Sequence, residues 1–516
     1  MPSRNQEYEL VARNSNEFDR PSDGFTAYEQ HGATTFPILS RWNKFWRKSP
    51  HSYKELNASP FRRRRVYRRV CSCLALLPLL AAILVTLTMI FRPSYTYPPQ
   101  HFTELRSRCM QLKEPGRGNV NNEKIFIAAS LYEKEGSLVE GAWGKALEKL
   151  VELIGPANVY VSIYEDNADD ITVAALRSLD ERLQCNSSIG SEKLSYNELP
   201  HFKLPNGKER LKRITFLAEV RNRALRPLDE SSQLPHFDKL LYLNDVIFDP
   251  IDAIQLLFST NVDGEGHAQY RAACAVDFIN PFKFYDTFAT RDLEGYGMGV
   301  PFYPWFSDAG RGYSRRDVLD QKDAVRVRSC WSGMVAFDAG YFQPENSPHM
   351  NVEGGDAVTN LPVKFRSEEN TFWDSSECCL IHADIQPLRE HTGDSKPTGI
   401  YMNPYIRVAY DEYTLSWLPL TRRAERLYSP IHNFLNHMVG MPWFNARRTQ
   451  EPGDNVSLKV WHNHDTNDDN SQGAFVDEAR IATPGGFCGL RGVSVLNEHP
   501  KKGEPKWERL PAPADS

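Results

Sequence analysis

The stretch KIFIAASLYEKEGSLVEGAWGKALEKLVELIGPANVYVSIYEDN, residues 124–167, decides the fold. Its first apolar run, residues 124–132, is short and typical of a buried strand. The next segment has a helical stripe of apolar side chains: Leu138, Ala142, Ala146, Leu150 and Leu153. Gly155-Pro156 ends this helix, and residues 158–167 form a second strand pattern. Strand, helix and strand in this order favour an α/β sheet with a parallel core.

The same alternation continues along the chain. Residues 169–183 form a helical pattern with acidic residues in the first turn, and residues 213–228 form another. Strand patterns follow at three places: FDKLLYLNDVIFDP (237–250), YRAACAVDFI (270–279) and CWSGMVAFDAGYF (330–342). The sequence therefore predicts one α/β domain over residues 123–495, with a Rossmann-type mixed sheet and flanking helices, and a disordered tail over residues 496–516.

The N-terminal part differs from this domain. Residues 71–91, CSCLALLPLLAAILVTLTMIF, carry no charge and as a helix would extend about 31 Å, enough to cross a bilayer. An arginine cluster precedes them: Arg62, Arg63, Arg64, Arg65, Arg68 and Arg69. The positive-inside rule then predicts a single-pass type II protein with a disordered cytosolic tail (1–70), a transmembrane helix (71–91) and a lumenal stem (92–122). A buried core helix is the alternative interpretation of residues 71–91.

This topology predicts how the lumenal part is modified. Of the sequons at Asn57, Asn186 and Asn455, only the last two would lie on the glycosylated side. Seven cysteines follow the span: Cys109, Cys185, Cys274, Cys330, Cys378, Cys379 and Cys488. Disulfides are permitted there, and because seven is odd, at least one thiol is free or pairs between chains.

Composition excludes several classes of protein. Hydrophobic residues make up 41% and charged residues 25% of the chain, which excludes a disordered protein and a polytopic transporter. A net charge of −5 gives no nucleic-acid footprint. The chain contains no GxSxG, HExxH, Walker A or GxGxxG motif.

Polar residues follow the predicted strands at their carboxyl ends, where α/β sheets bind ligands. Glu165 and Asp166 end the strand at 158–167, and Asn244 and Asp245 end the strand at 237–250. Arg221-Asn222 stands in the helical segment between them. This order resembles nucleotide-sugar glycosyltransferases of the GT-A type. The resemblance implies a donor site at Glu165, Asp166, Arg221, Asn222 and Asn244.

In that type of enzyme an acidic motif after a later strand holds a divalent metal ion on the donor diphosphate. Asp245 is the predicted carboxylate for Mn²⁺ or Mg²⁺, hard ions that prefer oxygen ligands. The motif here is Asn244-Asp245-Val246 and not Asp-x-Asp, so Asp249 or a distant residue is the candidate second ligand. A plain turn cap is the alternative role for Asn244-Asp245.

The C-terminal half supplies the predicted acceptor side. In FRSEENTFWDSSECCLIHADI (365–385), Glu377, His382 and Asp384 surround a short apolar strand. Glu377 could position or deprotonate an acceptor hydroxyl, and His382 could complete the metal shell. Trp331 and Asp338 are the predicted acceptor-binding residues, since an aromatic ring stacks on sugar faces.

The combination of these segments resembles the fungal capsule-associated α-1,3-mannosyltransferase family, typified by cryptococcal mannosyltransferase. The resemblance runs through KIFIAASLY, LAEVRNRAL, LLYLNDVIFDP, CWSGMVAFDAGYF and SECCLIHADI and ends near GGFCGLRGV. It implies metal-assisted transfer of mannose from GDP-mannose to a mannoside or other glycan acceptor in the Golgi or ER lumen, with α-1,3 linkage and retention, in the service of capsule polysaccharide. A Golgi transferase complex is a possible partner.

Two alternatives remain open from the residues. A catalytically silent GT-A-like Golgi scaffold or glycan-binding factor is favoured by the missing second aspartate. A glycoside hydrolase would need two opposed carboxylates, whose separation a sequence does not give.

Overall fold

The computed structural model describes residues 60–230, 234–343, 361–386, 398–463, 473–498 and 505–513. The chain divides into two compact units: residues 20–92, and residues 1–19 together with 93–516. The first 59 residues of the predicted cytosolic tail lie outside the described part.

In the smaller unit the structure describes one helix, α3 (Pro60–Phe91), which contains the predicted span at 71–91. Side chains are described from Leu76 onward, so the arginine cluster, Cys71 and Cys73 lie outside that range. The large apolar side chains from Leu76 to Phe91 are mostly exposed. Over the residues whose side chains are described, which for α3 are those from Leu76 onward, no helix combines the length and the apolar character that crossing a membrane requires.

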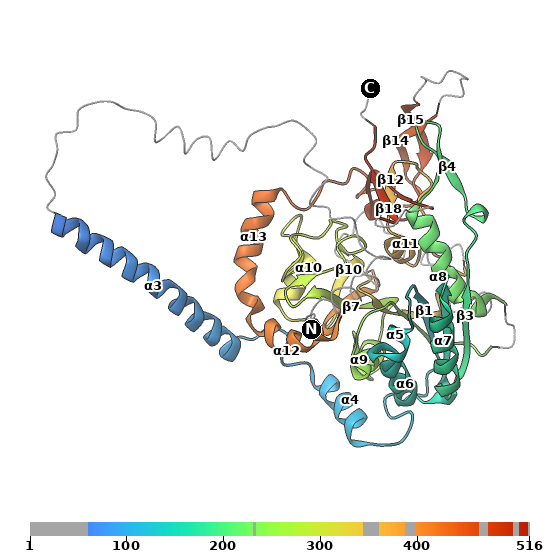
Figure 1. Cartoon of the computed structure of the whole chain (residues 1–516), viewed down its shortest axis with the longest axis horizontal. Coiled ribbons are helices and arrows are strands. Elements are labelled where there is room, and N and C mark those ends of the chain that lie inside the picture. The colour runs from blue at the N-terminus through green and yellow to red at the C-terminus, as the bar shows by residue number, and fades with distance from the viewer. Residues whose placement is uncertain are drawn as a thin grey trace, which may run out of the picture. The chain divides into compact units, whose positions relative to one another are not determined.

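The larger unit, shown in Figure 1, is built on one mixed sheet. The order of its strands is β3-β2-β1-β6-β11-β7-β13-β10-β9. Its first four strands are parallel: β1 (Ile125–Leu131), β2 (Val159–Asp166), β3 (Asn186–Glu192) and β6 (Lys239–Leu243). β11 (Met334–Asp338) runs antiparallel between β6 and β7 (Ala272–Asn280). β13 (Ile400–Ala409) is parallel to β7, while β10 (Val325–Ser329) is antiparallel to β13. Two short strands complete it: β9 (Arg291–Asp292) and β8 (Lys283–Phe284).

Side chains of β1 alternate between two cores, as the pleat of a strand requires. Ile125, Ile127 and Ala129 pack into a core covered by α4 (Gln100–Gln111), α5 (Ser137–Glu140), α6 (Ala142–Ile154), α7 (Asp170–Arg182) and α9 (Pro250–Ser259). Phe126 and Ala128 face the other core, which includes α8 (Arg213–Glu230), α10 (Tyr313–Leu319) and α11 (Glu377–Asp384). The fold is the predicted α/β architecture, with a mixed sheet between two helix-covered cores.

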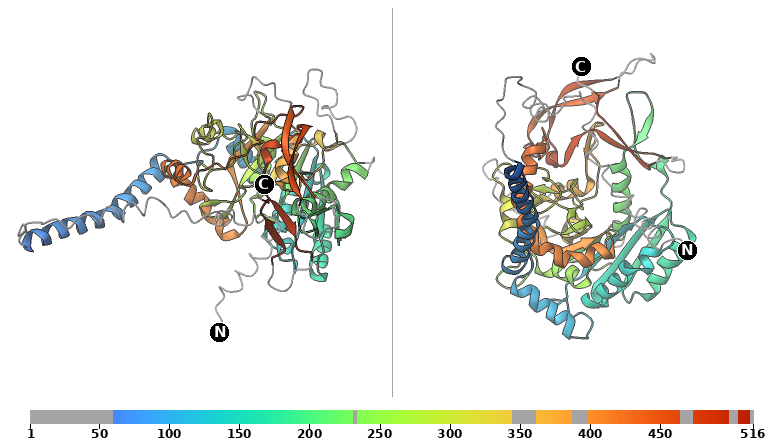
Figure 2. Two further views of the ribbon diagram at one scale, coloured as in Figure 1. Left: turned by 90° about the horizontal axis from the view of Figure 1, so that it is seen from above. Right: turned by 60° about the vertical axis from the view of Figure 1, so that its left-hand side comes forward.

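The remaining elements lie outside the main sheet. Two helices follow β13: α12 (Glu412–Thr421) and α13 (Tyr428–Val439), joined by η5 (Arg422–Leu427). Short turns of 3₁₀-helix are η1 (Pro156–Asn158), η2 (Tyr196–Glu198), η3 (Ala339–Tyr341) and η6 (Gly486–Cys488). Four strand pairs complete the unit: β4 (His201–Lys203) with β5 (Glu209–Leu211), β12 (Trp373–Ser375) with β16 (Gly489–Arg491), β14 (Asn455–His462) with β15 (Ala474–Ile481), and β17 (Val493–Leu496) with β18 (Trp507–Leu510). The β14–β15 hairpin, in orange-red, stands at one end of the unit (Figure 2).

Three segments differ from the sequence-based interpretation. Residues 92–122, expected as a stem, contain α4, whose Phe102, Leu105 and Cys109 are buried in the core shared with α9. Trp507, inside the tail expected to be disordered, belongs to β18 and packs on Phe216. The apolar run after Glu377 forms helix α11 and not the predicted strand. The run is buried on every side, and the periodicity of such a run does not distinguish a buried helix from a buried strand.

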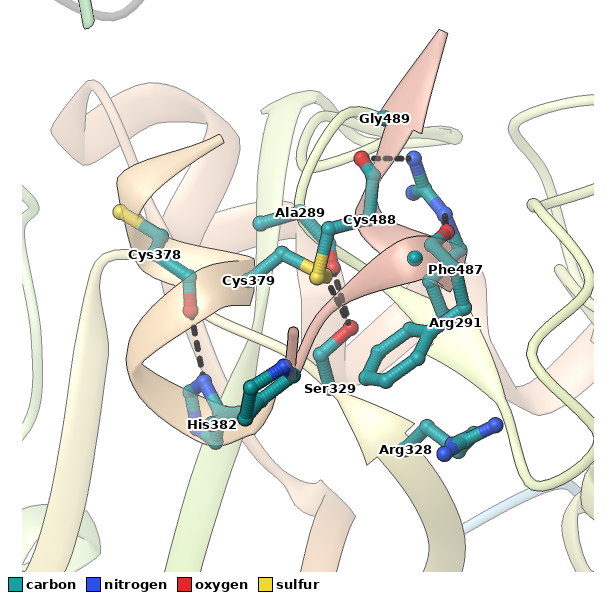
Figure 3. The surroundings of a disulfide bond; sticks show 12 residues. Ala289, Arg291, Arg328, Ser329, Cys378, Cys379, His382, Phe487, Cys488 and Gly489 are labelled. Carbon is teal, nitrogen blue, oxygen red and sulfur yellow. Dashed lines mark hydrogen bonds between the residues drawn. A yellow bond between two sulfur atoms is a disulfide. The ribbon is translucent and has the colours of Figure 1, made fainter. Parts of the chain in front are cut away.

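Two disulfides form in the described chain, Cys274–Cys330 and Cys379–Cys488. Cys109, Cys185 and Cys378 belong to neither bridge, which agrees with the prediction that at least one thiol is free or pairs between chains. Figure 3 shows the second bridge, which ties α11 to η6.

Candidate functional site

The carboxyl ends of β1, β2, β6 and β7 meet at one edge of the sheet, because these strands run in the same direction. Glu165 and Asp166 are the last residues of β2, and Glu165 lies opposite Leu131 of β1. Asn244 and Asp245 follow β6 directly. The structure thus brings the acidic strand ends predicted from sequence to a single edge, as the rule for α/β sheets requires.

Arg221 of α8 is the centre of a buried polar cluster at this edge. Its Nε donates to Glu377 Oε1 at 3.0 Å, and its Nη1 donates to Asn244 Oδ1 at 3.0 Å. The guanidinium lies 4.5 Å from the centre of the Trp331 ring, and Trp331 Nε1 donates to the same Asn244 oxygen at 3.3 Å. Four residues singled out from distant parts of the sequence therefore touch one another. We call Arg221, Asn244, Trp331 and Glu377 the Arg221 cluster.

The burial of this cluster decides its role. The side chains of Arg221 and Glu377 are 3% and 2% exposed, so their charges compensate each other away from water. A buried charge requires such a partner. The contacts of Glu377 with Arg221, and of Asn244 with Arg221 and Trp331, are internal to the protein. The cluster therefore supports the loop that carries Asp245.

Asp245 is held in place by its neighbours. The Asn244 amide donates to Gly333 O at 2.8 Å, and Asn244 O accepts from Trp143 Nε1 at 2.9 Å. Gly333 has a φ of 70°, and a Cβ there would lie 2.4 Å from Val246 Cγ1. Only glycine lets the turn at 331–333 pack this closely on residues 245–246. Asp245 itself is half-buried at the carboxyl edge of β6.

Glu165 is a buried acid, and one of its carboxylate oxygens has no hydrogen-bond partner among the described residues. Its Oε1 accepts from the Glu133 amide at 3.1 Å, whereas its Oε2 is buried without a hydrogen-bond partner. Burial, opposed by the Glu133 amide and reinforced by neighbouring acids, raises the pKa of Glu165 to about 8. A buried oxygen without a partner is costly, so Glu165 is suited to meet a polar group of a ligand at the end of β2.

Asp166 is satisfied within the protein. Its Oδ1 accepts from the Leu194 amide at 2.9 Å and from Tyr164 Oη at 3.4 Å. Burial raises its pKa above the usual value of an aspartate.

A second pair of acids at this edge was not singled out from the sequence. Asp277 near the end of β7 accepts from Tyr410 Oη at 3.1 Å and from the Asp286 amide at 3.1 Å. Asp286 Oδ2 accepts from the Trp331 amide at 2.9 Å and the Ser332 amide at 3.3 Å. The pair therefore fixes the turn that contacts Asn244 and Val246, on either side of Asp245. Burial, reinforced by the charge of Asp286, raises the pKa of Asp277 to about 8.

The sequence could have predicted Asp277 as a site residue, because it follows an apolar run in YRAACAVDFI as Asp166 follows one in the second strand. Asp286 gave no such signal, because it lies in an irregular segment beyond β8.

Three predicted site residues are engaged elsewhere. Asn222 exchanges two hydrogen bonds with the backbone of Phe365, at 2.8 and 2.9 Å, and so clamps that segment to α8. Asp338 lies opposite Lys239, at the start of β6, which is about 13 Å along the strand from Leu243. It caps η3 through the Gly340 amide. The structure therefore separates Asp338 from the predicted acceptor site, because β11 is antiparallel.

His382 is the third of these residues, and the contacts given for it lie within the buried core. It is fully buried, and its Nδ1 contacts Cys378 O at 2.7 Å (Figure 3). Its Nε2 lies 3.9 Å from Cys274 Sγ. Cys274, Cys330 and His382 lie close enough to hold an ion, but both sulfurs belong to a disulfide and thiolate is the form that binds metal. Burial lowers the pKa of His382 to about 4.

Asp249 does not supply the missing second carboxylate. It caps α9 through the Ile251 amide at 2.9 Å and pairs with Arg106 at 2.8 Å. Among the ligands predicted from sequence, Asp245 is therefore the one placed at the binding edge. Mg²⁺ and similar ions are commonly held by one or two carboxylates together with substrate phosphates. Asp245 is an oxygen donor of the kind that such an ion binds.

Comparison with known proteins identifies relatives of this chain. A family model described as Cryptococcal mannosyltransferase 1 matches residues 124–384, just over half of the chain. That range includes all of the Arg221 cluster, Asp245 and the acids at the end of β2. Curated proteins give no match.

Several solved structures are similar at low identity. The mannosyltransferase PcManGT from Pyrobaculum calidifontis, in complex with GDP-Man and Mn²⁺, is 10% identical with a TM-score of 0.32, over 71% of this chain and 75% of that one. S. aureus TarS 1-349 with UDP-GlcNAc is 11% identical with a TM-score of 0.28, over 56% and 59%. Mannosyl-3-phosphoglycerate synthase from Rubrobacter xylanophilus is 11% identical with a TM-score of 0.27, over 76% and 94%.

Proposed function

The chain belongs to the Cryptococcal mannosyltransferase 1 family, and from this premise we propose that it transfers mannose from GDP-mannose to a mannoside or other glycan acceptor. Glycosyltransferase function is what the family carries; the donor, the α-1,3 linkage and retention of configuration are our proposal. The observation that supports it most is the half-buried Asp245 at the carboxyl edge of β6, fixed by the Asn244 backbone and the Arg221 cluster.

Each residue at the edge has a part in this proposal. Asp245 would hold a Mn²⁺ or Mg²⁺ ion, which would supply positive charge to the diphosphate leaving group. Glu165 meets a polar group of the nucleoside through its unpartnered oxygen. Arg221 holds Asn244 and Trp331 in register. Trp331 is 4% exposed, so its contribution to an acceptor site is to shape the wall beneath it.

Glu377 has a supporting role in this account. Its Oε1 accepts from Arg221 Nε and from Cys378 Sγ, and the side chain is shielded from solvent. A general base must reach the proton that it removes. Retention by a front-face substitution needs no dedicated base, because the leaving phosphate accepts the acceptor proton. We therefore assign Glu377 as the partner of Arg221 and not as the catalytic base.

The cellular setting is also proposed. We place α3 in a Golgi or ER membrane as a type II anchor, with the α/β unit in the lumen. The exposed apolar side chains from Leu76 to Phe91 support this arrangement, since water is a poor solvent for them. Synthesis of capsule polysaccharide, within a complex of transferases, is the corresponding role.

A matched pair of variants tests the activity. The full chain is assayed with GDP-mannose and a mannobiose, with and without Mn²⁺. Asp245→Asn should lower transfer by at least about a hundredfold, because one electrostatic contact in a transition state contributes about 3 kcal/mol. Asp338→Asn removes a like charge at the opposite edge of the same sheet and should leave transfer unchanged. If Asp245→Asn transfers mannose as fast as the wild type and Asp338→Asn do, then Asp245 is not part of the catalytic site.

A second candidate function rests on the engagement of Asp249. Asp249 caps α9 and pairs with Arg106, so it does not act as the second carboxylate of an Asp-x-Asp motif. The competing proposal is therefore a glycan-binding factor that does not catalyse transfer. Binding of GDP-mannose without transfer to any mannoside would favour it.

A further inference from the structure

Helix α13 is amphipathic in the opposite sense to a helix on a water-soluble surface. Its buried residues are polar, His432 and Asn436. Ile431 and Phe434 are 53% and 68% exposed, and Met438 is 63% exposed. Residues 431, 434 and 438 have the spacing of one helical stripe. A helix in contact with water buries such a stripe and exposes its polar residues.

The inward polar contacts show that this orientation is built into the fold. His432 Nδ1 contacts Arg315 Nη1 at 2.9 Å, and Nε2 contacts Val300 O at 3.1 Å. Asn436 Oδ1 accepts from the Val300 amide at 2.8 Å. Burial, reinforced by the charge of Arg315, lowers the pKa of His432 to about 4. Turning the helix over would break these bonds, so its apolar stripe is fixed on the outside.

Neighbouring segments carry further exposed apolar side chains. On α12, Trp417 and Leu420 are exposed, and Tyr413 packs its ring 6.0 Å from Trp417. Beyond α13, Trp443 and Phe444 are 47% and 92% exposed. We call the exposed apolar side chains of residues 413–444 the α12–α13 face. In Figure 1 these two helices, in orange, lie on the side of the unit away from β1–β3. Apolar patches of this extent mark a contact surface.

The chain itself indicates what covers the face. Helix α3 ends at Phe91, and Pro93 is the first residue of the larger unit. Pro93 O accepts from Arg426 Nε at 3.5 Å, and Arg426 lies in η5, between α12 and α13. Tyr95 is then fixed in the core, with its Oη donating to Val318 O. The exposed apolar helix therefore joins the unit at the link between the two helices of the face.

We propose that the α12–α13 face lies in the interfacial region of the same bilayer that holds α3; this rests on the proposed membrane anchoring. Ile431, Phe434 and Met438 would enter the acyl boundary, as the apolar side of an interfacial helix does. Trp417 and Trp443 would lie at headgroup level, which tryptophan prefers. The face then fixes the larger unit against the membrane, so α3 is not its only attachment.

Photocrosslinking of the full chain tests this contact. Benzophenone-alanine replaces Phe434 or Phe444 in protein reconstituted into vesicles of phosphatidylcholine and phosphatidylserine. Ile171 on α7, which is 60% exposed, is replaced in the same way as a matched control. We expect phospholipid adducts, measured by mass spectrometry, at positions 434 and 444 and several times fewer at 171.

Other outcomes overturn the proposal. Crosslinked dimers in place of lipid adducts would show that a second copy covers the face, and equal lipid adducts at 171 would show no preferential contact. Alkaline extraction of the same vesicles separates this proposal from the anchoring. Protein that stays in the membrane but gives no adduct at 434 or 444 retains α3 as an anchor and contradicts the interfacial contact.

Discussion

The ion pair between Arg221 and Glu377 links α8 to α11 beneath the proposed donor site. Glu377→Ala leaves Arg221 buried without its carboxylate, and we expect a loss of about 3–5 kcal/mol in the free energy of unfolding. Glu377→Gln keeps an acceptor for Arg221 Nε and should lose less. Urea unfolding measures both. A large loss of transfer by Glu377→Gln, with no change in stability or in the KM for GDP-mannose, would instead make Glu377 a catalytic residue.

Buried acids make the stability of the fold depend on pH. Glu165 and Asp277 have pKa values of about 8, above the usual 4.5 and 3.8, because burial disfavours their charged forms. Between those values each of these two acids binds more protons in the folded chain than in the unfolded chain, so the stability that it contributes falls as pH rises from about 4 to about 8. Asp277→Asn cannot ionise and should lose part of this slope in urea unfolding.

The exposed acid Glu265 provides the control for this measurement. Its side chain is 87% exposed, and Glu265→Gln should leave the slope unchanged. If Asp277→Asn and the wild type have the same slope from pH 4 to pH 8, then Asp277 is ionised in the fold and our interpretation of the Asp277–Asp286 pair is wrong.

Sequence reasoning found much of the site at the scale of single residues. Glu165 and Asp245 were identifiable because each follows an apolar strand. The sequence did not show that Asn222 and Arg221 have different roles. Adjacent residues on a helix point about 100° apart, and Asn222 therefore binds the backbone of Phe365 instead of joining the Arg221 cluster. His382 was predicted as a ligand by analogy with GT-A sheets, and its burial against Cys378 and Cys274 follows from packing that the sequence does not reveal.

At the scale of elements, the direction of β11 determines which of the residues predicted from 330–342 lie near Asp245. Residues 330–342 were recognisable as a strand, yet nothing in their pattern shows that β11 runs antiparallel to β6. That direction puts the turn at 331–333 beside Asp245 and Asp338 at the other edge. Local periodicity predicts that a strand exists, whereas its direction follows from pairing with distant strands.

The disulfide between Cys379 and Cys488 joins α11 to η6 across 109 residues of sequence (Figure 3). We expect Cys379→Ser to lower the free energy of unfolding by about 2–5 kcal/mol, since a bridge restricts the unfolded chain. Cys185→Ser, at a free and half-buried thiol, is the control and should change stability much less. Thermal unfolding with equal losses in both variants would contradict a stabilising role for the bridge.

At the scale of the whole molecule, the proposed topology predicts where glycans attach. Asn186 and Asn455 are exposed at the starts of β3 and β14, so both sequons are accessible to an oligosaccharide. In the native host, Asn186→Gln and Asn455→Gln should each remove one glycosidase-sensitive step in gel mobility, and Asn57→Gln should remove none. Modification of Asn57 instead would reverse the proposed orientation.

At this scale the α/β class and the family were predictable, because strand–helix alternation and acids at strand ends are local signals. The packing of α4 on α9 was not, since Phe102 and Leu105 lie in a short polar helix. The inverted polarity of α13 was also hidden, because an apolar stripe looks the same whether it faces a core or the outside.

Donor binding tests the central claim most directly, that the edge around Asp245 holds the sugar nucleotide. Calorimetric titration of the full chain with GDP-mannose in Mn²⁺ compares wild type, Asp245→Asn and Asp338→Asn. The account predicts that Asp338→Asn binds as the wild type does and that Asp245→Asn binds at least about tenfold more weakly, a loss of about 1.4 kcal/mol. Unchanged affinity in Asp245→Asn, with or without Mn²⁺, would contradict it.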